Sequence, residues 1–269
     1  MRNKRDPQSK ELCHGFSLIE LLIVVAIITL VLAGILTQID QVQQRSVAEQ
    51  GKVDDFQQAR DFLDQIFRDA RQMGYPNFHN FDISQGAWQN PLVNDSRIAS
   101  GLVKLTATEL DFEGDVDGSG NVSVVSYKIN GNGSCATCIQ RAQVTKINTI
   151  VPLTQVSNLS TNPNAYSVEV QNVQNVAAIF TAYDVNGNAL TLPIDITTNN
   201  GKSVAQVRTI QAQLKIASPS AIDPKTGQQL EADIEGRVQV VNCSMATTQS
   251  VLQAAGINMP GEVKLACQP

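Results

Sequence analysis

The chain has 269 residues, of which 42% are hydrophobic and 5% aromatic, and its formal net charge is −5. This length allows one membrane helix with one globular head or two small ones, and the apolar content excludes a disordered chain. The negative balance leaves no general basic surface that could follow nucleic-acid phosphates. We therefore expect no nucleic-acid partner.

An apolar run from Phe16 to Leu36 is the dominant feature of the first part of the chain, and Glu20 is its only ionisable side chain. As a helix this run would extend roughly 31 Å at about 1.5 Å per residue, which matches a hydrocarbon core of about 30 Å. Residues 1–15 are hydrophilic and net positive, so they are expected on the cytoplasmic side. An acid inside a membrane is costly and usually functional, which makes Glu20 a candidate functional residue.

The residues at the start of this run carry a specific resemblance. Residues 15–27 read Gly-Phe-Ser-Leu-Ile-Glu-Leu-Leu-Ile-Val-Val-Ala-Ile, and this resembles the processing site of type IV prepilins and type II secretion pseudopilins. The resemblance implies that prepilin peptidase cleaves after Gly15 and that Phe16 becomes the N-methylated first residue. It also implies a bacterial inner-membrane protein, single-pass, with a cytoplasmic leader and a periplasmic head, which later joins a pilus or pseudopilus.

Physical reasoning agrees with this interpretation. Cleavage would free the amine of Phe16, and a helix start with a positive amine attracts a carboxylate. Glu20 of one subunit can then neutralise the Phe16 amine of its neighbour, because either charge alone would be costly in the membrane. Two alternatives fit this segment less well. An ordinary secretory signal would have a shorter apolar region and a small-residue cleavage site, and a simple membrane anchor leaves Glu20 unexplained.

The helix is expected to continue beyond the membrane. The sequence divides into a leader (1–15), an assembly helix (16–37), an amphipathic helix (38–74) and a β-rich head (75–269). In the third segment apolar residues recur at steps of three and four, which is typical of a helix with one packed face: Phe56, Ala59, Leu63, Ile66, Phe67, Ala70 and Met73. The charged residues between them, Asp55 and Asp69 included, are interpreted as a solvated face with pairs such as Asp64 with Arg68.

After residue 77, short alternating segments are separated by Asn, Gly and Ser clusters, which is typical of antiparallel strands. The predicted strands are Leu102–Thr106, Glu109–Glu113, Val122–Ile129, Ile139–Lys146, Val176–Tyr183, Val204–Ile216 and Arg237–Val241. Segments 77–100, which holds Trp88, and 148–175 are predicted to be loops. The apolar helix stripe would cover the sheet, so the fold class is α+β and pilin-like.

A second resemblance covers most of the chain after the leader with weaker motifs. Residues 59–77, the acidic hairpin at 110–118 and the strand–insert–strand region at 207–242 are similar to PilW-type minor pilins and, more loosely, to the J-type minor pseudopilin.

The cysteines suit an oxidising compartment. Cys13 would leave with the leader, and the four that remain allow three pairings. Cys135–Cys138 and Cys243–Cys267 are favoured, because neighbours in the sequence meet most easily. The alternative is a four-cysteine zinc site, for which Cys135-x-x-Cys138 has half of the required spacing.

Two loops were considered as calcium sites. Asp115, Asp117 and Ser119 alternate as oxygen ligands do at the start of a calcium loop, but Ser126 stands where the closing acid is required. The loop that begins at Asp184 is a poorer match. Asp, Asn and Gly are equally what a hairpin turn requires, so calcium is the sole candidate cofactor and a turn is its alternative.

Catalysis is not expected. Once the leader is removed, His79 is the remaining histidine, and no Gly-rich phosphate loop or Gly-x-Ser-x-Gly elbow occurs in the sequence. The sequence favours a structural subunit: a minor pilin that initiates or tips a type IV pilus. Its expected partners are prepilin peptidase, other major and minor pilins, and the inner-membrane assembly platform. The alternatives are a minor pseudopilin of type II secretion and an adhesive or ligand-binding tip head. The tip head would show an exposed apolar or aromatic patch, which Trp88 and Tyr166 alone do not establish.

Overall fold

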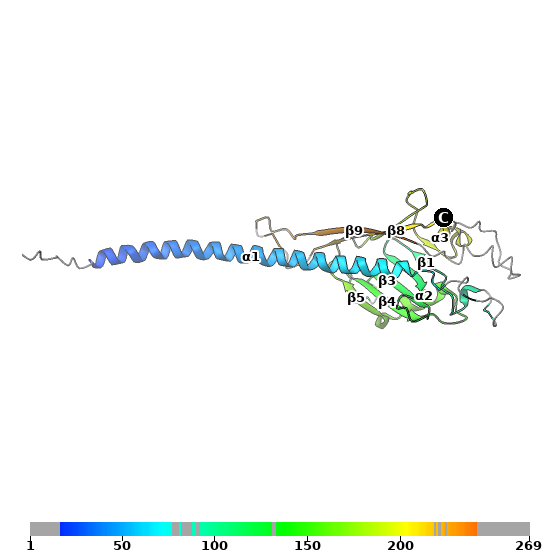
Figure 1. Ribbon diagram of the computed structural model, residues 1–269. Coiled ribbons are helices and arrows are strands. Elements are labelled where there is room, and N and C mark those ends of the chain that lie inside the picture. The colour runs from blue at the N-terminus through cyan, green and yellow to red at the C-terminus, as the bar shows by residue number, and fades with distance from the viewer. Residues whose placement is uncertain are drawn as a thin grey trace, which may run out of the picture. The chain divides into compact units, whose positions relative to one another are not determined.

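A computed structural model describes residues 17–76, 81, 88–89, 92–130, 133–217, 219, 222–223 and 225–240. The chain divides into two compact units, one up to Val47 and the other from Ala48 onward. Helix α1 (Leu18–Arg71) contributes to both units (Figure 1). The second unit, called the head below, also contains the sheets and the shorter helices.

In the first unit, α1 is apolar and exposed. Its membrane-length window has a mean hydropathy of 3.0 and none of that window is buried within the protein. A helix of this length and composition can cross a membrane, although a signal sequence near an N-terminus passes the same test. Gly34 has no neighbouring atom within 4 Å of where a side chain would begin, so nothing in the structure requires a glycine there.

The larger sheet of the head has six strands in the order β5-β4-β3-β2-β1-β7, and all of its neighbours are antiparallel. Its strands are β1 (Leu102–Leu105), β2 (Glu109–Gly114), β3 (Ser123–Ile129), β4 (Ile139–Thr145), β5 (Tyr166–Val170) and β7 (Ile194–Asp195). The first four are successive hairpins close to the predicted bounds, as expected where turn residues separate alternating segments.

The smaller sheet has three antiparallel strands in the order β6-β8-β9, namely β6 (Phe180–Tyr183), β8 (Thr209–Ile216) and β9 (Ala232–Gln239). In β8, Ile210, Leu214 and Ile216 are buried, as the alternation predicts. At Gly236 of β9, an added Cβ would lie 2.3 Å from a ring carbon of Phe67. This glycine therefore allows β9 to pack closely against α1.

The main core of the head joins α1 to both sheets, and Figure 1 shows the second half of α1 running between the strands of the two. The predicted helix stripe supplies one side of this core: Ala59, Leu63, Ile66, Ala70 and Met73 are each at most 4% exposed. Phe62 also packs here, edge-on to Tyr127 with ring centroids 5.7 Å apart. Phe56, in contrast, is 44% exposed, so the stripe begins to pack after that residue.

A second, smaller core lies on the opposite face of the six-stranded sheet. Helix α2 (Pro152–Ser160) covers that face through Val156 and Leu159, which pack with Val124 of β3 and Ala142 of β4. The six-stranded sheet is thus buried on both faces, by α1 on one and by α2 on the other.

Several predicted bounds were wrong. Segment 148–175 is not a loop, since it contains α2, a short 3-10 helix (Pro163–Ala165) and β5. The predicted strand at 204–216 begins with helix α3 (Lys202–Gln206), which follows another 3-10 turn (Thr198–Gly201), so β8 starts at Thr209. Strand β6 is shorter than predicted and β9 begins earlier. The single predicted sheet is two sheets, because strand partners far apart in the chain leave no local sequence signal.

The interpretation of the α1 charges as a solvated face also fails at two positions. Asp55 and Asp69 are 8% and 5% exposed. Asp69 accepts a hydrogen bond from the Tyr127 hydroxyl at 2.6 Å and pairs with Arg141 at 2.8 Å. It lies three residues after Ile66 and four before Met73, on the buried stripe, so its spacing on the helix already indicated burial.

Candidate assembly site at the N-terminal helix

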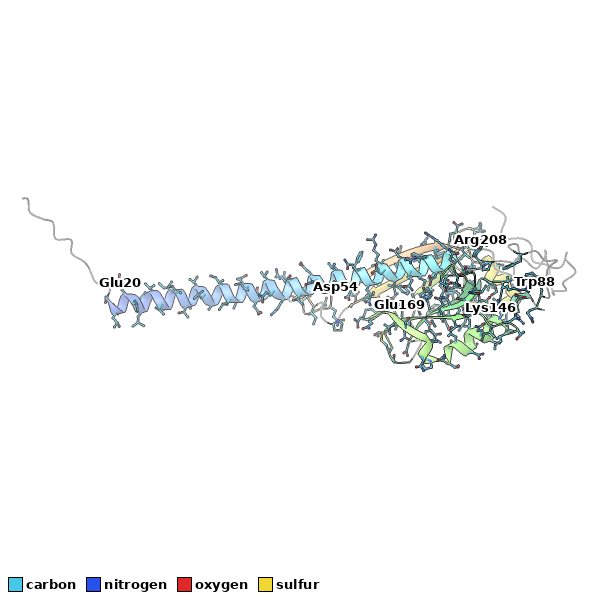
Figure 2. The ribbon with its side chains drawn as sticks, turned by 60° about the horizontal axis from the view of Figure 1, so that its bottom comes forward. Glu20, Asp54, Trp88, Lys146, Glu169 and Arg208 are labelled. Atoms are coloured by element: carbon cyan, nitrogen blue, oxygen red, sulfur yellow. A yellow bond between two sulfur atoms is a disulfide. The ribbon has the colours of Figure 1, made fainter. Side chains whose placement is uncertain are left out.

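The structure places Glu20 in the first turn of α1 (Figure 2). The Ser17 carbonyl accepts the backbone N–H groups of Glu20 at 3.0 Å and of Leu21 at 3.2 Å, which closes the turn that carries the carboxylate. Glu20 is exposed and its large apolar neighbours are exposed as well, with Leu18 at 78% and Leu22 at 60%. One carboxylate thus stands on an apolar surface that no other described residue of its own unit covers.

The two processing residues, Gly15 and Phe16, lie outside the described residues. Of the three residues predicted for processing and assembly, Glu20 is therefore the one that the structure describes. The carboxylate sits at the positive end of the α1 dipole, where negative charge is favoured.

Comparison with known families bears directly on this segment. Residues 12–36 match the family model described as the prokaryotic N-terminal methylation motif. The N-terminus is of the prepilin type. The matched residues include the predicted cleavage position, Glu20 and the whole apolar run. A search of the curated proteins found no match for the chain.

The prepilin-type motif supports a type IV pilin or a pseudopilin. It implies a structural subunit, cleaved by prepilin peptidase and assembled with other pilins, and not an enzyme. Together with the exposed apolar half of α1, it fits a protein that is first anchored in a membrane and then enters a pilus.

The predicted calcium ligands form the turn between β2 and β3. The Asp115 carboxylate accepts the backbone N–H groups of Ser119 at 3.0 Å and Gly120 at 2.9 Å, and Asp117 accepts Ser119 N–H at 3.0 Å. In the second loop, Asp184 accepts the N–H groups of Asn186 and Asn188, each at 2.8 Å. These contacts are those of Asx turns, so the geometry favours the turn alternative at both loops.

No cluster of three or more His, Cys, Asp or Glu side chains suited to a metal occurs among the residues that the structure describes. Cys135 and Cys138 form a disulfide, with Cα atoms 5.4 Å apart, which fits the local pairing favoured from the sequence. Their sulfur atoms are bonded to each other and so do not form half of a zinc site. Cys243, Cys267 and His79 lie outside the described residues.

The two aromatic residues weighed as an adhesive patch do not form one. Tyr166 is only 6% exposed, and its hydroxyl lies 3.1 Å from Ser126 Oγ. Trp88 is half-buried, and the Arg97 guanidinium stacks 3.9 Å from its ring centroid. Figure 2 shows Trp88 on the head.

Sequence reasoning missed a buried charged network beneath α2. Glu109, Asp111 and Glu113 alternate along β2 with Leu110 and Phe112 of the main core, so the three acids share the opposite face. Such an alternation is ordinarily typical of a strand with one wet face. All three acids are nevertheless at most 5% exposed, because the unpredicted helix α2 covers that face.

Lys146 neutralises one of these acids. Its ammonium donates to Glu113 at 2.7 Å and to the carbonyls of Val93 at 2.7 Å and Ile98 at 2.8 Å, and both charged side chains are fully buried. Ser100 donates its N–H and its hydroxyl to the same Glu113 oxygen. Through these hydrogen bonds, the Lys146–Glu113 pair holds residues 93–100 against the sheet. Buried pairs of this kind need such additional hydrogen bonds to offset desolvation.

A second network, built around Asp69, fixes α1 to the six-stranded sheet. Arg141 donates to Asp69 at 2.9 Å and to the Tyr127 hydroxyl at 3.1 Å. Burial, together with the Asp69 carboxylate beside it, raises the pKa of Tyr127 well above its usual range. The phenol therefore stays neutral and donates a hydrogen bond to Asp69.

Proposed function

We propose that this protein is a minor subunit that initiates or tips a type IV pilus, is cleaved after Gly15, and enters the fibre through its N-terminal helix. The observation that carries the proposal is one acid, Glu20, in the first turn of an exposed apolar helix that matches the methylation motif.

The proposed mechanism is charge pairing between neighbours. Glu20 lies four residues after Phe16, which is slightly more than one helical turn, or roughly 6 Å along the axis at about 1.5 Å per residue. A neighbouring helix shifted by about one turn would bring its Phe16 amine level with this carboxylate. Because an unpaired ion in a membrane is costly, the pairing would favour this one axial shift.

The proposed division of the chain follows the same logic. The leader (1–15) stays on the cytoplasmic side, segment 16–37 is the assembly helix that first anchors the precursor in the inner membrane with its head in the periplasm, segment 38–74 joins it to the head, and 75–269 is the head. The unit from Ala48 onward includes two sheets and three helices among the described residues. A head of this size on every subunit would crowd a thin fibre, which favours a minor, terminal position.

The test compares the full-length variants E20A and E20Q with D40A, which removes an exposed acid from the same helix outside the apolar run. We expect all three to be cleaved after Gly15. E20A and E20Q should be depleted at least tenfold from sheared fibres, whereas D40A should enter them as the wild type does. Normal incorporation of E20A would refute the pairing mechanism.

Deleting the gene distinguishes a pilus subunit from a minor pseudopilin of type II secretion, which would use the same helix physics. The proposed function predicts loss of surface pili with normal export of secreted enzymes. Loss of export with normal pili would assign the chain to secretion instead.

A further inference from the structure

The strongest unexplained feature of the head is Asp111, the middle acid of the three on β2. Its side chain is fully buried, and neither carboxylate oxygen has a hydrogen-bond partner. An ionised carboxylate with no donor is among the most costly groups to bury, and such a group usually becomes neutral instead.

The two neighbouring acids show what Asp111 lacks. Glu113 is paired with Lys146, and Glu109 with Lys104 and, at 3.7 Å, with Lys128. Each of these acids therefore has at least one cation in contact. No cation of the described part of the chain forms an ion pair with Asp111, although Lys104 is its cross-strand neighbour.

Among the described residues, no donor lies in full hydrogen-bond geometry to either oxygen of Asp111, and Ser126 has the hydroxyl group that lowers its pKa. Across the ladder from it lies Ser126, whose hydroxyl is paired with that of Tyr166. Helix α2, which covers this face, has the sequence PLTQVSNLS and contains no titratable side chain. Among the described residues, the charged and titratable groups on the same face are Glu109 and Glu113 of β2, Lys104 of β1, Lys128 of β3, Tyr166 of β5, Asp195 of β7 and Lys146 after β4.

We propose that Asp111 is a proton-binding switch: as a neutral acid it lets α2 pack on the sheet, and its ionisation loosens α2. The alternation along β2 points its side chain to the face that α2 covers through Val156 and Leu159. Ionised Asp111 would need water, and α2 packs on this face of the sheet, so movement of α2 would admit water to the fully buried carboxylate.

The pKa of Asp111 is shifted in the direction that this switch requires. Burial is the largest effect on the pKa of Asp111 and the Glu109 carboxylate is the second, and both raise it well above its usual range. Ser126 and Lys104 lower this pKa by smaller amounts. The folded head then holds a proton that the unfolded chain releases above about pH 3.9. The stability of the head is therefore greatest below that pH. Above it, the folding equilibrium constant falls by up to tenfold per pH unit, until the pH reaches the pKa of Asp111 in the folded state.

The direct test is infrared spectroscopy of the full-length protein in detergent, for the wild type and D111N. We expect the wild type at pH 7 to show the carbonyl band of a neutral carboxylic acid, and D111N to lack it. Absence of the band in the wild type at pH 7 would overturn the proposal, whether or not the variant folds.

Hydrogen exchange then tests the link to α2. With intrinsic rates corrected for pH, amides of residues 152–160 in the wild type should exchange at least tenfold faster above the pH at which the band disappears. In D111N this acceleration should be absent. The matched control is D117N, which removes a fully exposed acid from the adjacent turn and should keep the wild-type pH response. An equal pH response in wild type and D111N would refute the switch.

Discussion

The buried pair of Lys146 and Glu113 offers the sharpest test of how the head is held together. In K146M the Glu113 carboxylate would stay fully buried and keep only the two hydrogen bonds from Ser100. Removing one partner of a buried ion pair costs about 3–5 kcal/mol. At about 2–4 °C per kcal/mol for a head of this size, the midpoint of thermal unfolding should fall by roughly 6–20 °C.

Chemical unfolding of the full-length protein in detergent, followed by circular dichroism, measures this loss. The double variant K146M/E113L should recover most of it, because two apolar side chains of similar volume leave no buried charge behind. The control is K215M, which breaks a half-exposed pair with Asp233 and should cost at most about 1 kcal/mol. A K146M protein within 1 kcal/mol of the wild type would refute the reasoning.

Three further predictions concern the head. G236A should lower the free energy of unfolding by about 1–3 kcal/mol, because the added methyl group overpacks against Phe67. The double variant G236A/F67L should recover part of this loss. Unfolding midpoints measure both effects, and a G236A protein as stable as the wild type would contradict the close packing of β9 on α1. Because burial and the Asp69 carboxylate raise the pKa of Tyr127, the stability of the head should fall above about pH 10, where the phenol of the unfolded chain ionises. Unfolding measured between pH 9 and 12 should show a smaller loss of stability in Y127F than in the wild type. An equal loss in both proteins would exclude Tyr127 as the cause. D115A should lower the midpoint of unfolding equally with and without calcium, because it removes the hydrogen bonds of the turn. A rise in the wild-type midpoint on addition of calcium would support the calcium site instead.

The parts of the fold that followed from the sequence are those with local periodicity. An apolar run and a stripe at steps of three and four give α1, and alternation between turn residues gives β1–β4 and most of β8. The proposal for Glu20 also rests on a local signal, because a lone acid in an apolar membrane helix is costly and usually functional.

The parts that were missed depend on contacts distant in sequence. Helix α2 has nine residues rich in Asn and Ser, yet Leu153, Val156 and Leu159 recur every three residues after a Pro at its start, and this was the available signal. Without α2, nothing in the sequence shows that the acids of β2 are buried. Asp111 and the Lys146 pair were therefore not predictable until the helix that covers them was known.

The most direct measurement is the intact mass and N-terminal peptide of the protein recovered from cells that contain prepilin peptidase. We expect a chain that begins at N-methylated Phe16, lighter than the full sequence by residues 1–15. A mature protein that still carries those fifteen residues would have no free Phe16 amine to meet Glu20, and it would contradict assembly through the N-terminal helix.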